Sequence, residues 1–108
     1  MMGSITENNP LLRKIKEAVS DLQPEAEVIL YGSRARGTST AGSDWDLLLL
    51  VPRDSRPMRE IIRRRIYEIE WSCGEVFSVV IRQKDAWNNP RVAKSPFHRN
   101  VENEGIRL

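Results

Sequence analysis

Two aspartates in the middle of the chain have the types and spacing that metal-dependent phosphate chemistry needs. Asp44 and Asp46 stand one residue apart at the head of the apolar run at residues 47–51, which is typical of a buried strand. Side chains alternate along a strand, so the two carboxylates share one face while Trp45 faces the other way, toward the expected core. Two carboxylates this close repel each other unless cations lie between them. They suit Mg²⁺ bound together with substrate phosphates, and two such ions can be shared in an in-line displacement at phosphorus.

A phosphate-binding turn is expected just ahead of this pair. Gly32 and Ser33 follow an apolar run at residues 28–31 and precede a helical turn expected at residues 34–37. Glycine lets the backbone pass close to a ligand, and free N–H groups at a helix start attract anions. Each half has a simpler explanation, because Gly-Ser after a strand is often only a turn and Asp44 could cap the loop. A second acid at the head of an apolar strand is costly to bury unless it is paired, so the combination favours a functional site. The motif is neither a Walker P-loop nor a dinucleotide-binding fingerprint.

The elements around these motifs predict an α+β (α/β) fold, a small mixed sheet flanked by helices. Strands are expected at residues 26–31, 44–51 and 75–82. Helices with apolar positions at helical spacing are expected from Pro10, after an Asn9 cap, to near residue 24, and at residues 57–72 and 97–104. Residues 84–87 are expected to form a helical turn, residues 38–43 and 88–96 are expected to be loops, and Ile106 and Leu108 remain available to pack.

Length and composition limit the class of protein. The 108 residues predict one domain spanning residues 1–108, with residues 1–8 as a flexible terminus. A content of 40% hydrophobic and 30% charged residues is typical of a soluble globular protein, and it argues against disorder. The longest apolar run is far short of the ~18 residues that span a bilayer, and no signal peptide is evident, so a cytoplasmic location without membrane association is predicted. The single cysteine, Cys73, fits a reducing compartment or a buried, inert thiol.

Several other residues have more than one interpretation. The net charge of +2 does not by itself indicate a nucleic-acid binder. Six arginines lie close together in the sequence: Arg53, Arg56, Arg59, Arg63, Arg64 and Arg65. They form either a solvated helix face or a surface for an acidic or phosphate-rich partner. Arg34 could bind phosphate or pair with the aspartates. Trp71 and Trp87 stand at element ends, where packing at the rim is expected. His98 has no Cys or His nearby in the sequence, so a metal-ligand role is not expected.

The two motifs together resemble the signature of the DNA polymerase beta-like nucleotidyltransferase superfamily. The resemblance is carried by residues 31–37 (Tyr-Gly-Ser-Arg-Ala-Arg-Gly) and residues 43–48 (Ser-Asp-Trp-Asp-Leu-Leu). In length the chain is most similar to the minimal, stand-alone nucleotidyltransferase domains of bacteria and archaea, and residues 96–108 resemble their tail.

This resemblance implies a nucleotidyltransferase fold and a role for each matching residue. Gly32 and Ser33 would hold the triphosphate of a nucleotide, ATP above all, with Arg36 and Ser43 assisting from the loop. The two aspartates would be the catalytic acids and would bind two Mg²⁺ ions. An acceptor hydroxyl would then attack the α-phosphate and release pyrophosphate, and the acceptor would be supplied by, or be part of, a protein partner.

The sequence departs from the superfamily pattern at the third carboxylate. Members carry this acid on the next strand, and its expected position falls near Ser78, which is neither an anionic Mg²⁺ ligand nor a base at neutral pH. Glu75, at the strand start, is the alternative candidate. Loss of a positioned base typically costs about 10²–10⁴-fold in rate. Three interpretations therefore remain open: an active transferase, a weakly active or inactive nucleotide-binding module such as the antitoxin half of a toxin–antitoxin pair, and a structural domain with a decayed site. A nucleic-acid partner is not indicated.

Overall fold

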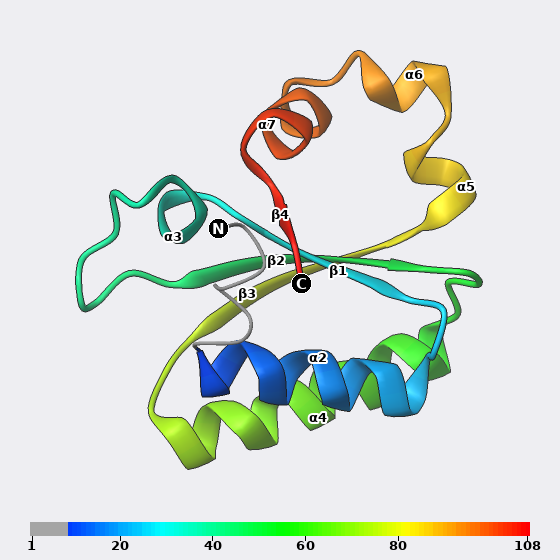
Figure 1. The fold of residues 1–108 in the computed structure, drawn as a ribbon. Coiled ribbons are helices and arrows are strands. Elements are labelled where there is room, and N and C mark those ends of the chain that lie inside the picture. Colours follow the sequence, from blue (N-terminus) through cyan, green and yellow to red (C-terminus); the bar gives the residue numbers. More distant parts are fainter. Residues whose placement is uncertain (1–8) are drawn as a thin grey trace.

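The computed structural model describes residues 9–108, and the prediction for residues 1–8 lies outside that range. Four strands form one mixed sheet in the order β3-β2-β1-β4 (Figure 1). Their bounds are Glu27–Tyr31 (β1), Trp45–Val51 (β2), Phe77–Gln83 (β3) and Ile106–Arg107 (β4). Strand β2 runs antiparallel to β1 and parallel to β3, and β4 runs antiparallel to β1. The predicted mixed sheet is confirmed, with β4 added at its edge.

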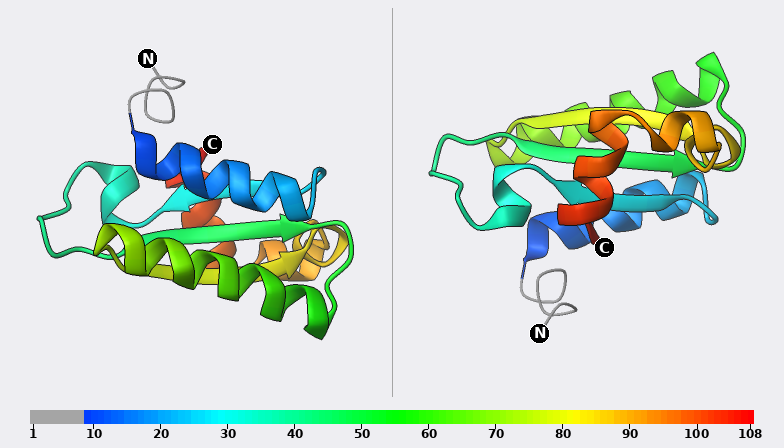
Figure 2. Two further views of the ribbon diagram at one scale, coloured as in Figure 1. Left: turned by 90° about the horizontal axis from the view of Figure 1, so that it is seen from below. Right: turned by 90° about the horizontal axis from the view of Figure 1, so that it is seen from above.

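Helices cover both faces of the sheet (Figures 1 and 2). One face carries α2 (Pro10–Leu22) and α4 (Arg56–Cys73), and the other carries α5 (Lys84–Trp87), α6 (Pro90–Ala93) and α7 (Pro96–Glu104). The short α3 (Ser33–Arg36) follows β1 at one end of the sheet. The Asn9 side chain accepts the Leu11 and Leu12 N–H groups at the start of α2, and Ser55 caps α4 in the same way.

Strand β2 is buried on both faces, which explains its uninterrupted apolar run. Trp45, Leu47 and Leu49 face the larger core under α2 and α4, so the expected core position of Trp45 is confirmed. Leu48 and Leu50 face a second core beneath α5–α7. A strand enclosed by helices on both sides has no solvent face on which polar residues would alternate.

The structure corrects the sequence-based prediction at three places in the C-terminal part of the chain. Residues 88–96 contain α6, which begins after an Asn89 side chain that accepts the Arg91 N–H. Trp87 is not at the rim: it is 2% exposed and meets the Phe97 ring edge to face. The fourth strand was missed because two residues are too few to show a periodicity, although the Leu108 N–H extends the pairing to the Val28 carbonyl.

Within residues 9–108, no helix combines the length and hydropathy needed to cross a membrane.

Candidate active site

Three segments of the chain meet at one end of the sheet. The end of β1 leads into Gly32, β2 begins beside it, and β3 begins on the far side of β2 (Figure 1). In the strand register Asp46 lies between Tyr31 on β1 and Ser78 on β3. The antiparallel pairing of β1 with β2 therefore brings the Gly-Ser turn next to the aspartates, although residues 34–43 separate them in the sequence.

Gly32 cannot be replaced by a larger residue without moving the site. Its φ of 77° and ψ of −161° lie in a region that is essentially restricted to glycine. A Cβ at this position would overlap the Asp46 Oδ2 atom. The backbone of the turn and the carboxylate are thus in direct contact, and this closeness brings the predicted phosphate-binding turn and the predicted metal-binding acid to one point.

The acid pair is electrostatically strained. Burial raises the pKa of Asp46, the charge of Asp44 raises it further, and the Arg36 guanidinium opposes both. The pKa of Tyr31 is also raised, first by burial and then by the charge of Asp46. The negative charge at this corner is therefore only partly compensated, and a bound cation would relieve it.

The donor set fits magnesium bound jointly with a substrate. Among the described residues there is no group of three or more His, Cys, Asp or Glu side chains arranged to hold a metal ion. Proteins nonetheless often bind Mg²⁺ through only one or two carboxylates, because this ion takes most of its other ligands from phosphates and water. The carboxylates of Asp44 and Asp46 fit that pattern.

The loop between α3 and β2 is held by Arg34, which makes no ion pair with either aspartate. Its guanidinium carbon lies 4.3 Å from the centroid of the Trp45 ring, and its Nη2 donates to the Ser43 carbonyl at 2.8 Å. It therefore points to the core face of the sheet, opposite Asp46. The Ser43 hydroxyl accepts the Thr40 N–H at 2.9 Å, so this predicted nucleotide-binding side chain shapes the loop. Ser33 begins α3, and its carbonyl accepts the Thr38 N–H.

Glu104 is a site residue that sequence reasoning missed. Its Oε1 accepts the Gly32 N–H at 3.0 Å, and its Oε2 lies 3.0 Å from Nη1 of Arg36. The hydrogen bond from Arg36 is the main reason why the pKa of Glu104 is lowered. Two of the predicted phosphate-binding groups are thus engaged by a carboxylate from the end of α7. The sequence offers no local signal for this contact, because 67 residues, 37–103, separate Arg36 from Glu104.

The third carboxylate is absent from the position where it was expected. Ser78 lies directly beside Asp46 in the parallel register, so the neighbouring strand presents a hydroxyl there. Glu75 borders a hollow together with Trp45 and Cys73, on the α4 side of the sheet, and is not brought together with Asp46. The Cys73 thiol, for which a buried position was considered, is exposed.

The arginine cluster is in part a solvated, internally paired surface. Arg56 pairs with Glu60 at 3.2 Å, Arg59 pairs with Asp54 at 3.1 Å, and Arg63 donates to the Val79 carbonyl.

On the other face of the sheet, the ring of His98 stacks on Trp87 with centroids 4.3 Å apart, and Glu102 lies within ion-pair distance of His98.

Comparison with known proteins defines the class. The nucleotidyltransferase domain family matches residues 12–105, which include the Gly-Ser turn, both aspartates and Glu104. The chain belongs to this nucleotidyltransferase domain family.

One protein of related sequence and one solved structure of similar fold match the chain. A protein of Methanocaldococcus jannaschii named "Putative protein adenylyltransferase" is 30% identical over 94 residues, which are 87% of this chain and 92% of the relative. The solved structure described as "Crystal structure of the toxin-antitoxin with AMP-PNP" aligns with a TM-score of 0.63 at 20% identity. It covers 88% of this chain and 69% of the matched chain, and at that identity it shows that the two share a fold.

Proposed function

We propose that this nucleotidyltransferase is a magnesium-dependent protein adenylyltransferase, which moves the adenylate of ATP onto a hydroxyl of a partner protein. The observation that carries the proposal is the contact between Gly32 and the Asp46 carboxylate, with Asp44 directly before the first residue of the same strand. The archaeal relative named as a protein adenylyltransferase supports the choice of adenylate and of a protein acceptor. The AMP-PNP in the structurally similar toxin–antitoxin complex supports an adenine nucleotide.

In the proposed reaction an acceptor oxygen forms a bond to the α-phosphorus of ATP. The bond from that phosphorus to the bridging oxygen breaks, and pyrophosphate leaves. Gly32, Ser33 and Arg36 would hold the β- and γ-phosphates, and the two aspartates would hold magnesium, which would neutralise phosphate charge. Ser78 cannot take the proton of the acceptor hydroxyl, so the proton passes to solvent and slow turnover is expected.

Binding and transfer test the proposal separately. Asp44→Asn and Asp46→Asn preserve side-chain size, and each is expected to abolish MgATP binding in a calorimetric titration. Asp21→Asn removes one exposed carboxylate from α2, away from the site, and is expected to bind MgATP like the unmodified chain. Retention of MgATP binding by both site variants would overturn the assignment. Transfer is measured as label from α-phosphate-labelled ATP that becomes attached to protein in host extract.

A second candidate is a nucleotide-binding module with little transfer activity, such as the antitoxin half of a toxin–antitoxin pair. The serine at the place of the third carboxylate favours it, and so does the occupation of Arg36 by Glu104. This alternative predicts MgATP-dependent capture of one helical partner protein without label transfer.

A further inference from the structure

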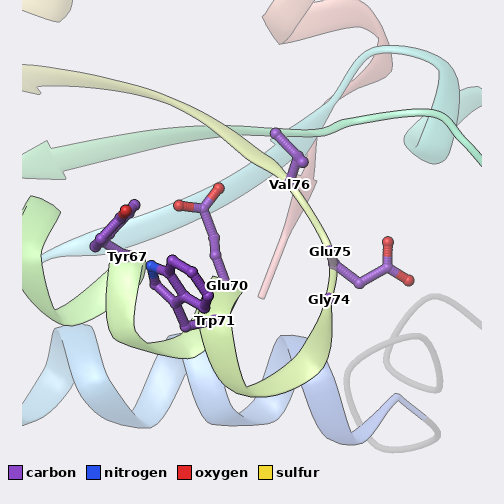
Figure 3. A pocket seen from close by; sticks show the side chains of 6 residues that line it. All are labelled: Tyr67, Glu70, Trp71, Gly74, Glu75 and Val76. Carbon is purple, nitrogen blue, oxygen red and sulfur yellow. The ribbon is translucent and has the colours of Figure 1, made fainter.

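An apolar hollow of about 510 Å³ lies where the end of α4 meets the start of β3 (Figure 3). Three of its lining side chains are large and open to solvent: Tyr67 is 57% exposed, Trp71 75% and Val76 55%. The rings of Tyr67 and Trp71 meet edge to face with centroids 6.2 Å apart. Exposed apolar side chains that gather around one concavity mark an interaction surface, whereas scattered ones need no explanation.

The strand order puts this hollow on the side from which an acceptor must approach. Strand β2 lies between β1 and β3, so the Gly32 turn and the hollow flank the aspartates on opposite sides. Displacement at phosphorus is in line, so the attacking oxygen enters opposite the leaving pyrophosphate. With pyrophosphate held at the Gly32 turn, the acceptor approaches over the start of β3.

Val76 connects the hollow to the acid pair. The Trp45 N–H donates to the Val76 carbonyl at 2.9 Å, which extends the pairing of β2 and β3 beyond the strand and sets Val76 beside Asp44. Val76 alternates with Ser78, which lies beside Asp46, so its side chain faces the same side of the sheet as the acids. Figure 3 shows Val76 pointing away from α4, toward that side, while Glu75 points away from the two rings.

The occupant of the hollow binds through side chains, because the backbone of the β3 edge is engaged. The Phe77 N–H donates to Glu70 Oε2 at 2.8 Å, and the Val79 carbonyl accepts from Arg63 at 3.1 Å. The Ile81 carbonyl accepts from Arg82 Nη1 at 2.9 Å. Side chains that occupy an edge in this way block the addition of another strand.

We infer that this hollow receives the acceptor protein, through a segment that places an apolar side chain against Tyr67 and Trp71 and its hydroxyl beside Asp44. Charge favours protein over nucleic acid: Glu70 and Glu75 line the hollow, and the phosphates of an RNA or DNA acceptor would be repelled there. The same charges favour a neutral or basic segment over an acidic one. The inference rests on the proposed function, since the direction of approach follows from it.

The test uses the full chain saturated with magnesium and the α,β-methylene analogue of ATP, whose α-phosphorus cannot be transferred, and measures fluorescence anisotropy with defined probes. Three labelled synthetic peptides each carry one tyrosine and two leucines and differ only in having lysine, glutamine or glutamate at the other positions. The fourth probe is a labelled oligoadenylate with a free terminal ribose hydroxyl. Trp71→Ala is compared with Ile61→Ala, which trims another exposed apolar residue of α4 (47% exposed) that does not line the hollow.

The lysine and glutamine peptides are expected to bind, and the glutamate peptide and the RNA to bind several-fold more weakly. Trp71→Ala should weaken peptide binding about tenfold, as the loss of a central aromatic anchor does, while MgATP affinity stays unchanged. Ile61→Ala should bind peptide like the parent chain. Equal binding by the two variants, failure of every peptide to bind, or Trp71-dependent binding that favours RNA would each overturn the inference. Failure of the proposed function is seen separately, as loss of MgATP binding by the unmodified chain.

Discussion

The Glu104 carboxylate holds two groups that the proposed triphosphate needs, the Gly32 N–H and the Arg36 guanidinium. Its lowered pKa keeps it charged at neutral pH, where it would compete with the proposed triphosphate for Arg36. Glu104→Gln retains an oxygen for the Gly32 N–H and removes the charge. MgATP is expected to bind about two- to fivefold more tightly in a calorimetric titration, because a solvent-exposed ion pair contributes at most about 1 kcal/mol.

The control for that variant is Glu102→Gln, which makes the same charge change on α7 and keeps an oxygen for the Trp87 indole N–H. Its MgATP affinity should match that of the unmodified chain. Weaker binding by the Glu104 variant would mean that the carboxylate positions Arg36 for phosphate and does not compete with it.

Ser78 is the residue at which activity is expected to be gained. Ser78→Asp places a third carboxylate directly beside Asp46 in the register of β2 and β3. A positioned base contributes about 10²–10⁴-fold, so label transfer from ATP should rise by at least about a hundredfold. The control is Ser78→Asn, whose side chain has the size of aspartate but no charge, and it should leave the rate of label transfer unchanged. Equal rates in the two variants would show that proton removal does not limit turnover.

At the scale of elements, the turn between β1 and α3 is the most sensitive backbone of the site. Gly32→Ala and Gly37→Ala both put a side chain at positive φ, 77° and 78°, on either side of α3. Gly37→Ala should lower the free energy of unfolding by about 1–2 kcal/mol in chemical denaturation, the cost of a non-glycine residue in the left-handed α region. Gly32→Ala should lower it by more, because its φ and ψ lie in a region essentially restricted to glycine and its Cβ would overlap Asp46. Only at Gly32 does a Cβ meet another group, Asp46, whereas nothing lies within 4 Å of one at Gly37. Gly32→Ala alone should therefore lose MgATP binding. Equal losses of MgATP affinity in the two variants would show that backbone strain, not the aspartate contact, sets that affinity.

Elements with local signals were predicted from the sequence, and contacts between distant segments were not. The Asn9 cap with Pro10 and the apolar stripe of α4 depend on neighbouring residues, so both helices lie close to their predicted bounds. Ser78, near which the family resemblance puts the third acid, lies beside Asp46 in the register of β2 and β3, but the register itself cannot be read from the motif. The contacts of Glu104 with Gly32 and of Arg34 with Trp45 arise from tertiary packing, and no spacing rule gives them.

At the scale of the whole molecule, the proposed transfer uses the two sides of the aspartate pair differently, one side for the nucleotide and the other for the acceptor protein. The β1 side has the Gly-Ser turn and the arginine that suit phosphates, and the β3 side has exposed aromatic groups that suit a protein. Within the described residues no second layer covers the β3 edge, where Trp71 is 75% exposed. An acceptor protein that fills this edge would complete the enclosure of the site.

The stability of the whole chain is expected to depend on pH through two carboxylates with opposite effects. Burial and Asp44 raise the pKa of Asp46, so its charged form destabilises the fold once the pH exceeds that raised value. Arg36 lowers the pKa of Glu104, whose stabilisation is complete above the ordinary carboxyl pKa and is lost as the pH falls through the lowered value. With a metal chelator present at neutral pH, Asp46→Asn should have a higher melting temperature than the unmodified chain, and Glu104→Gln should have a lower one. Both differences should shrink as the pH is lowered through the acid range.

Added magnesium should raise the melting temperature of the unmodified chain and not that of Asp46→Asn. A lower melting temperature for Asp46→Asn than for the unmodified chain, in chelator at neutral pH, would show that the Asp46 carboxylate stabilises the fold.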